Sequence, residues 1–451
     1  MSQSFNDVTT ENLAQLYPKI LHTLADATFI AIDTEFTGLG VKGDNVRAAN
    51  IEDRYQNMAK VVKSHALNAI GLTAFKRTSE AEKPSVYRVD NFNLLLSLQA
   101  SYTVSAQSLR FLADSGFDFN KQIRLGLPYT TGSAEDKDAF GVKNLFRNIL
   151  MDINRLQIPI IIHNGLMDLM YLYYSLYTDL PSNLQVFAAD LSDMFPGGIY
   201  DTKYVSDYVS KEPVSFLSYL FKKYEREEKR RLAILNNPDQ DHGEKFTKRC
   251  FRVEIQPPFP IEQVMRKAVD VEEEGRLDSS AAQASNSRKK RRRKNKGSSA
   301  PKEEKLYCEQ YALHGYCRQN KQCGKSHDLD YILDEVEKSQ KRKKTGITAA
   351  DDEEAAVTPP DMNVDVPPLP AAPLIPGPSF YHSAHFDSYM TGYVFVHQLQ
   401  EFRDYTTHAN KLYLIGKDIP LPIQKSAFTS LSKGWQELKA ELQKMNHGTT
   451  S

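Results

Sequence analysis

The chain has 451 residues, with 57 Lys or Arg balanced by 57 Asp or Glu, so its formal net charge is zero. This length suggests two or three domains, and the content of 41% hydrophobic and 10% aromatic residues is enough for a sizeable core, which excludes a wholly disordered chain. Four cysteines are too few for a disulfide scaffold, and three of them cluster closely, which indicates metal binding in a reducing compartment. The sequence has no apolar run long enough for a membrane span and no apolar signal core, so we expect an intracellular soluble protein.

Strand-like and helical patterns are mixed in the first 235 residues. Such mixing is typical of a sheet flanked by helices, so the predicted fold class is α/β. The expected elements, in chain order, are strands at 29–36, 67–75 and 86–96, a helix at 106–114, a strand at 159–163 and a helix at 165–177.

The composition changes between residues 236 and 378. We expect disordered linkers at 236–300 and 333–378, with a compact Cys/His module between them at 301–332. Eight prolines within 359–378 exclude a regular helix or a sheet strand there.

Ordered patterns return after residue 378. Apolar residues at helical spacing predict a helix within 379–402, followed by a strand at 411–415 and a C-terminal surface helix that begins near 433. These residues form either a separate domain or the second part of one domain that carries an insertion.

Acidic residues accompany three of these elements. Asp33 and Glu35 lie two positions apart on a strand, so both side chains leave the same face. Two acids on a buried strand are costly unless a divalent cation compensates them; the alternative is an acidic pair at a solvated strand edge. Asp168 lies one turn into a helix that follows a strand end, where Asn164 could cap it; alternatively Asp168 only offsets the positive helix end.

The third acidic position is Asp387, in the helix expected after residue 378, and His382 lies five positions before it. Taken singly, Asp387 could merely cap or solubilise its helix, and His382 could be an exposed loop histidine. Taken together with the other acids, they form the set needed to hold two divalent ions for phosphodiester hydrolysis, with a histidine as general base.

Three segments carry a resemblance: FIAIDTEFTGLG, HNGLMDLMYLY and HSAHFDSYMTGYVF. They resemble the exonuclease motifs of the DEDD superfamily and, more narrowly, the poly(A)-specific ribonuclease and CAF1 deadenylase family. The resemblance covers most of 15–225 and 379–416, which favours one ribonuclease-H-like domain with an insert, in two parts at 1–235 and 379–451.

The resemblance implies roles for individual residues. The metal ligands, for two Mg²⁺ or Mn²⁺ ions, would be Asp33, Glu35, Asp168 and Asp387. His382 would be the base, and its spacing from Asp387 is that of the DEDDh subgroup. His385 is a competitor with the wrong spacing, and Asp201 is a rival acid that we interpret either as structural or as a support for the metal ligands.

The Cys/His module has the spacing C-x8-C-x5-C-x3-H, formed by Cys308, Cys317, Cys323 and His327. Four such ligands within 20 residues predict a tetrahedral Zn²⁺ site without which so short a segment lacks a core. The spacing resembles CCCH fingers that bind single-stranded RNA. Nearby aromatic and basic residues fit base stacking and phosphate contacts. These residues are Tyr307, Tyr311, Tyr316, Lys321 and Lys325. Alternatively, the tyrosines only pack the module, or the finger binds protein.

A basic run, RKKRRRKNK at 288–296, is typical of a nuclear import signal and could also bind RNA phosphates. A nuclease with such a run and a CCCH finger resembles the nuclear, zinc-finger-bearing deadenylases. That resemblance implies the nucleus, including the nucleolus, Cajal bodies and nuclear speckles, and as partners RNA 3′ ends, the import machinery and small nuclear ribonucleoproteins. The alternatives are a catalytically inactive RNA-binding protein and a DEDDh DNA exonuclease.

Overall fold

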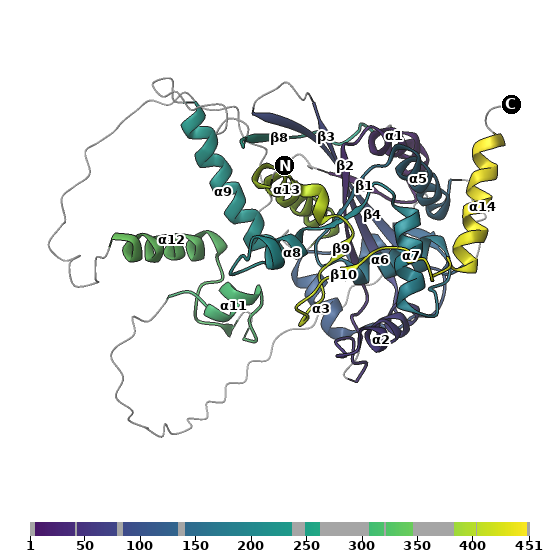
Figure 1. The fold of residues 1–451 in the computed structure, drawn as a ribbon, viewed down its shortest axis with the longest axis horizontal. Helices are drawn as coiled ribbons and strands as arrows, with labels where there is room; N and C mark the ends of the chain where they lie inside the picture. Colours follow the sequence, from purple (N-terminus) through teal and green to yellow (C-terminus); the bar gives the residue numbers. More distant parts are fainter. Residues whose placement is uncertain are drawn as a thin grey trace, which may run out of the picture.

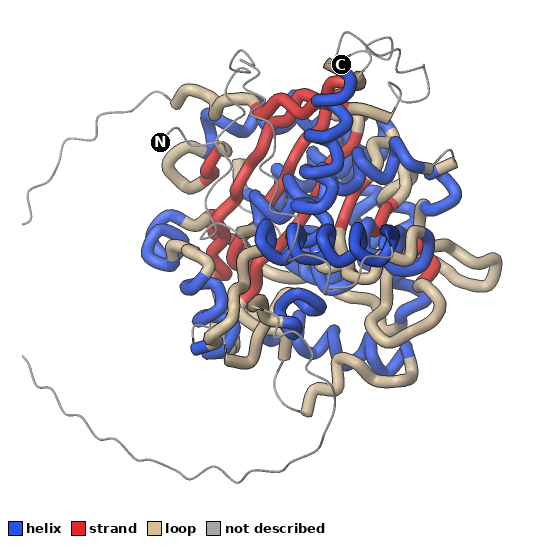
Figure 2. The backbone as a smooth tube through the Cα atoms, turned by 90° about the vertical axis from the view of Figure 1, so that its left-hand side faces the viewer, coloured by secondary structure: helices blue, strands red, loops and turns tan. Residues whose placement is uncertain are grey.

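The computed structural model describes residues 5–40, 43–78, 84–133, 140–236, 249–261, 306–319, 322–345, 383–402 and 404–448. A twisted mixed sheet crosses the molecule, with helices on both of its faces (Figure 1; Figure 2). Its strands are β1 (Asn6–Val8), β2 (Phe29–Phe36), β3 (Leu67–Arg77), β4 (Ser85–Leu98), β5 (Leu127–Tyr129), β6 (Ile160–Ile162), β7 (Ile199–Asp201), β8 (Phe251–Ile255), β9 (Lys411–Leu412) and β10 (Leu421–Pro422).

The strands follow the order β1-β4-β3-β2-β6-β7-β9-β10, and β5 and β8 also pair with β4. Strands β2, β3 and β4 are antiparallel neighbours, whereas β2, β6, β7 and β9 run parallel. The helices are α1 (Leu13–Ala25), α2 (Ile51–Ser64), α3 (Ala106–Asp114), α4 (Phe119–Leu125), α5 (Val142–Leu156), α6 (Leu166–Leu172), α7 (Leu184–Met194), α8 (Thr202–Tyr204), α9 (Leu217–Leu235), α11 (Glu309–His314), α12 (Leu329–Thr345), α13 (Ala384–Glu401) and α14 (Lys433–Gly448). Helix α6 continues into the π-helical turn η1 (Tyr173–Tyr177), η2 (Val205–Val209) is a second π-helical turn, and η5 (Tyr405–His408) is a 3-10 turn. The predicted mixed α/β class is therefore confirmed.

Strand β2 shows why both faces of the sheet are covered. Ile30 and Ile32 belong to the apolar core on one face, whereas Phe29 and Ala31 belong to the core on the other. Because side chains alternate along a strand, an unbroken apolar run has to be buried on both sides.

Helix α13 lies directly on the sheet although it follows 37 residues, 346–382, that lie outside the described part of the chain. A Cβ on Gly71 in β3 would meet the Ala384 carbonyl oxygen at 1.9 Å, and a Cβ on Gly392 would meet the Phe75 ring at 2.1 Å. The Thr73 and Ser388 hydroxyls are hydrogen-bonded at 2.7 Å. Glycine at these positions lets the helix and the sheet approach more closely than any side chain would allow.

Two elements contradict the expected linker boundaries. Strand β8, within 236–300, pairs in parallel with β4, and its Phe251 is buried in the core. Helix α12 runs from Leu329 to Thr345 and so enters the range 333–378, because Ile332 and Leu333 bury their side chains beside α9. Both linker predictions were wrong at these places, since short charged sequences were interpreted without their tertiary partners.

The basic run at 288–296 and the proline-rich stretch at 359–378 lie outside the described residues. Among the helices of the described ranges, none is both long and apolar enough to span a membrane.

Candidate active site

Three carboxylates from two distant parts of the chain form an acidic cluster. Asp33 and Glu35 come from the end of β2, and Asp387 comes from the first turn of α13. One ligand atom from each lies within 4.8 Å of the others. The expectation that Asp33 and Glu35 share a face is thus confirmed, and α13 supplies the third acid because it crosses β2 and β3 here.

Asp168 lies beside this cluster, in the first turn of α6. Strand β6 runs parallel to β2, with Ile30 opposite Ile160, so the helix that follows β6 starts beside the end of β2. The Thr34 hydroxyl donates a 2.5 Å hydrogen bond to Asp168 Oδ1. Thr34 was not singled out in the sequence, where the only available signal was a hydroxyl between two acids.

The charges of Asp387 and Asp168 destabilise the charged forms of Asp33 and Glu35. Burial, followed by the charges of Asp387 and Asp168, raises the pKa of Asp33 and of Glu35 well above the ordinary carboxyl value. Burial raises the pKa of Asp168 to about 6, against the opposing effect of the Thr34 hydrogen bond. Crowded, desolvated carboxylates of this kind are the oxygen ligands that hard divalent cations prefer, so the residues present fit a Mg²⁺ or Mn²⁺ centre.

Asp201 has a structural role, as its interpretation from sequence supposed. It is fully buried at the end of β7, where Oδ1 accepts the backbone N–H groups of Asn164 and Lys203 and Oδ2 accepts that of Tyr413. The prediction that Asn164 caps the following helix was wrong: Asn164 has a left-handed φ of 59°, and the helix begins after Gly165 without a side-chain cap. Asp201 therefore fixes the turn that leads to Asp168.

Two histidines, His382 and His385, are candidates for the general base. His382 lies outside the described residues. His385 is buried and stacks on Phe5 with the ring centroids 3.7 Å apart. Burial lowers its pKa to about 3, so this imidazole stays neutral in the core. The His385 imidazole is therefore part of the packed core at the start of α13.

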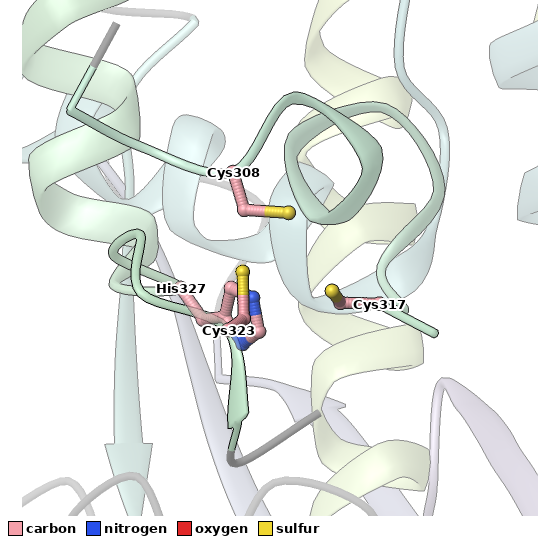
Figure 3. A group of neighbouring side chains, drawn as sticks. All are labelled: Cys308, Cys317, Cys323 and His327. Atoms are coloured by element: carbon pink, nitrogen blue, oxygen red, sulfur yellow. The ribbon is translucent and has the colours of Figure 1, made fainter. Parts of the chain in front are cut away.

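A second cluster joins Cys308, Cys317, Cys323 and His327, whose ligand atoms lie within 4.8 Å of one another (Figure 3). Cys308 precedes α11, and its Sγ accepts the Tyr311 backbone N–H at 3.4 Å. Three thiols and an imidazole at this separation fit a tetrahedral zinc site.

The tyrosines of this module divide into two groups. Tyr311 stacks on His327 with ring centroids 4.6 Å apart, and Tyr307 packs with it against a small apolar core. Tyr316 is 57% exposed. Two of the three candidate stacking residues therefore pack the module, and Tyr316 is the one available to a base. Lys321 lies outside the described residues, and Lys325 is exposed.

The fold and the site together define a mixed α/β protein with a carboxylate centre suited to divalent cations. A model of the CAF1 family ribonucleases matches residues 8–144 and 133–395, and the chain belongs to this family. The sequence is 30% identical over 142 residues to poly(A)-specific ribonuclease PARN of Danio rerio, covering 29% of this chain and 21% of that protein.

A second relative is the pre-piRNA 3′-exonuclease trimmer of Bombyx mori, 27% identical over 208 residues, which covers 44% of this chain and 34% of that protein. The matched region thus spans between a fifth and about a third of these two relatives. Among solved structures, the Mg²⁺- and Mn²⁺-bound form of S. pombe Pop2p aligns with 49% of this chain and 82% of that chain, at 20% identity and a TM-score of 0.40.

Proposed function

We propose that the protein is a 3′-to-5′ exoribonuclease that depends on two Mg²⁺ or Mn²⁺ ions and shortens adenosine-rich 3′ tails of RNA. The observation that carries this proposal is the convergence of Asp33, Glu35 and Asp387, with Asp168 beside them. Membership of the CAF1 family and the names of the relatives support an RNA substrate with a free 3′ end.

Each residue then has a defined task. Asp33, Glu35, Asp168 and Asp387 would hold the ions, which when bound supply an activated water and neutralise charge on the leaving oxygen. These carboxylates are half-buried and lie close together, so their charges act on one another at short range. His382 would accept the proton of the attacking water, and the products would be 5′-nucleotides.

The assay uses three 5′-labelled substrates of one sequence: RNA, RNA with a 2′-deoxy 3′ terminus, and DNA. The proposal predicts stepwise shortening of RNA from the 3′ end, dependent on Mg²⁺ or Mn²⁺. Shortening of DNA at an equal rate would favour a DEDDh DNA exonuclease instead. Binding without shortening of any substrate would favour an inactive RNA-binding protein. Replacing the terminal adenosines by uridines measures the preference for adenosine.

We also propose that residues 1–235 and 379–451 form one nuclease domain and that the inserted finger binds zinc. The contacts of α13 with β2 and β3 support the first statement, and the four convergent ligands support the second. Metal analysis of the purified chain should find one zinc, which Cys323→Ser removes. Cys250→Ser is the matched control, because Cys250 is buried near Glu228, far from the finger in sequence.

A further proposal concerns where in the cell the protein acts and on which RNAs. The chain resembles the zinc-finger-bearing deadenylase called target of early growth response, and we propose that it acts in the nucleus, including nucleoli, Cajal bodies and nuclear speckles. The basic run at 288–296 supports recognition by the import machinery. The proposed targets are 3′ tails of small nuclear RNAs within their ribonucleoproteins. Replacing the basic residues of the run by glutamine should leave a fluorescent fusion cytoplasmic, and nuclear retention would contradict this assignment.

A further inference from the structure

The Cys/His module packs against the nuclease domain through an apolar contact. Tyr311 and Leu333 belong to the same apolar cluster as Phe216 and Tyr219, which lie at the start of α9. A Cβ on Gly315 would approach the Phe216 ring to 2.9 Å, and Gly315 ends α11 with a left-handed φ of 73°. Glycine at this position therefore satisfies two demands, the turn after α11 and the close approach to Phe216.

Helix α12 lies beside α9 (Figure 1), and opposite charges extend the contact between these two helices. Arg226 of α9 pairs with Asp330 at 3.2 Å and with Asp334 at 2.6 Å, and lies 3.7 Å from Glu337. Arg230 also pairs with Glu337. Single exposed ion pairs contribute little, but one guanidinium shared by several carboxylates is a network with defined geometry.

The opposite side of α9 contacts the active-site helix. Phe221 of α9 meets Phe386 with ring centroids 5.9 Å apart, and Phe386 immediately precedes the cluster residue Asp387. Helix α9 therefore touches the finger on one side and the start of α13 on the other. This arrangement gives the finger a set position relative to the acidic cluster.

Docking leaves part of the finger open to solvent. Tyr316, Arg318 and Lys325 are all exposed. Arg318 and Lys325 also border a surface hollow that the three cysteines line. An exposed aromatic ring and two exposed cations on one small module suit stacking with a base and contact with phosphates.

We propose that α9 holds the finger and the acidic cluster as one preorganised binding surface, so that a single RNA strand contacts both. This inference rests on the proposed nuclease function. An RNA that is long enough to reach from the acidic cluster to the finger binds the finger at a high effective concentration, because the finger is already docked on α9 before RNA binds. Arg226 is thus a positioning residue that acts through the placement of the finger.

The test measures both binding and cleavage on a ladder of oligoadenylates of increasing length, with full-length protein. Wild-type protein should show a step at which the Kd and KM both fall, while kcat changes little. Arg226→Glu places a negative charge opposite three carboxylates and should weaken binding of RNAs beyond the step by about tenfold. Its kcat and KM on RNAs below the step should equal the wild-type values.

The controls separate docking from folding and from charge. Lys229→Glu reverses a charge on the same helix at an exposed position whose ion pair, to Glu225, stays within α9, and it should keep the step. Adding Asp334→Arg to Arg226→Glu restores an opposite-charge pair and should recover the step at least in part. Equal zinc content in all variants shows that the finger remains folded.

Two results would overturn the inference: no step in the wild-type Kd, or a step in Arg226→Glu that matches the wild type. A finger that binds only protein would give the first result. Failure of the proposed function looks different, because wild-type protein would then shorten no RNA of any length, whereas the binding measurement does not depend on cleavage.

Discussion

The hydroxyl of Thr34 and the carboxylate of Asp168 are joined by a 2.5 Å hydrogen bond across 134 positions of sequence. The bond links the end of β2 to the first turn of α6 and thereby couples two of the acidic motifs. Thr34 itself faces away from the Asp33 and Glu35 side chains, since neighbours on a strand point to opposite faces.

Thr34→Val should misplace Asp168 and lower the cleavage rate. A hydrogen bond to a charged group contributes about 1.5–3 kcal/mol, which corresponds to roughly a tenfold to hundredfold loss in kcat/KM. Thr34→Ser keeps the hydroxyl and should stay near the wild-type rate. A loss in Thr34→Ser with none in Thr34→Val would show that the methyl group, and not the hydrogen bond, is what matters.

Glu35→Gln should separate metal binding from folding. In EDTA the variant should melt at a higher temperature than the wild type, because it lacks a carboxylate whose charged form is destabilised by burial and by the charges of Asp387 and Asp168. Added Mg²⁺ should stabilise the wild-type protein by about 2.7 kcal/mol at a hundredfold excess over Kd and so raise its Tm. The same Mg²⁺ concentration should raise the Tm of the variant much less. Glu254→Gln, on the exposed side of β8, is the control that should follow the wild type. An equal rise in Tm with Mg²⁺ in Glu35→Gln and in the wild type would place the ions elsewhere.

His382→Ala should lower the cleavage rate by about 10² or more with little change in metal affinity, because it removes the proposed base. His385→Ala should leave the cleavage rate of the folded fraction unchanged. It should instead lower the Tm, since it removes a buried ring stacked on Phe5. Rates from active-site-titrated samples and thermal melts separate the two effects. An exchange of the two results would make His385 the base.

His397 should make the protein less stable as the pH falls. Burial, with Arg231 and Lys223 nearby, lowers its pKa in the folded state to about 3, and its ring stacks on Tyr224. The unfolded state, with a pKa of about 6.5, takes up a proton that the folded state refuses, so this contribution is lost progressively below pH 6.5. At pH 5 the loss relative to pH 8 is about 2 kcal/mol.

His397→Phe should therefore flatten the dependence of the free energy of unfolding on pH between 8 and 5, measured by urea titration. The control is His22→Phe at an exposed position, which should keep the wild-type slope. Buried acids such as Glu228, whose pKa burial raises to about 7, act in the opposite direction in both proteins and cancel in the comparison. An unchanged slope in His397→Phe would mean that the imidazole is protonated in the folded state.

Gly392→Ala tests whether α13 belongs to the same folding unit as the sheet. The added methyl group would lie 2.1 Å from a ring carbon of Phe75, which is fully buried. Overpacking of this kind costs about 1–3 kcal/mol, so the single unfolding transition should shift to lower denaturant concentration. Gly324→Ala adds a methyl group with no atom within 4 Å and should be neutral. A separate, small transition in Gly392→Ala would contradict the single-domain proposal.

The local sequence was sufficient for several elements. The apolar run of β2 was placed at 29–36, and the helix at 106–114 was placed where α3 lies, since periodicity and burial pattern are properties of adjacent residues. The convergence of Cys308, Cys317, Cys323 and His327 was likewise expected from their spacing alone. By the same logic, Asp33 and Glu35 were expected on one face of their strand.

Only the tertiary structure decided which of these residues meet. Asp387 joins Asp33 because α13 crosses the sheet over Gly71, a contact that no local pattern encodes. Strand β8 pairs with β4, and α12 docks on Arg226, through partners far away in sequence, so their charged local sequences were mistaken for linkers. Short-range propensity specifies how a segment can fold, whereas burial and pairing across the whole chain specify where it lies; the candidate site depends on the second.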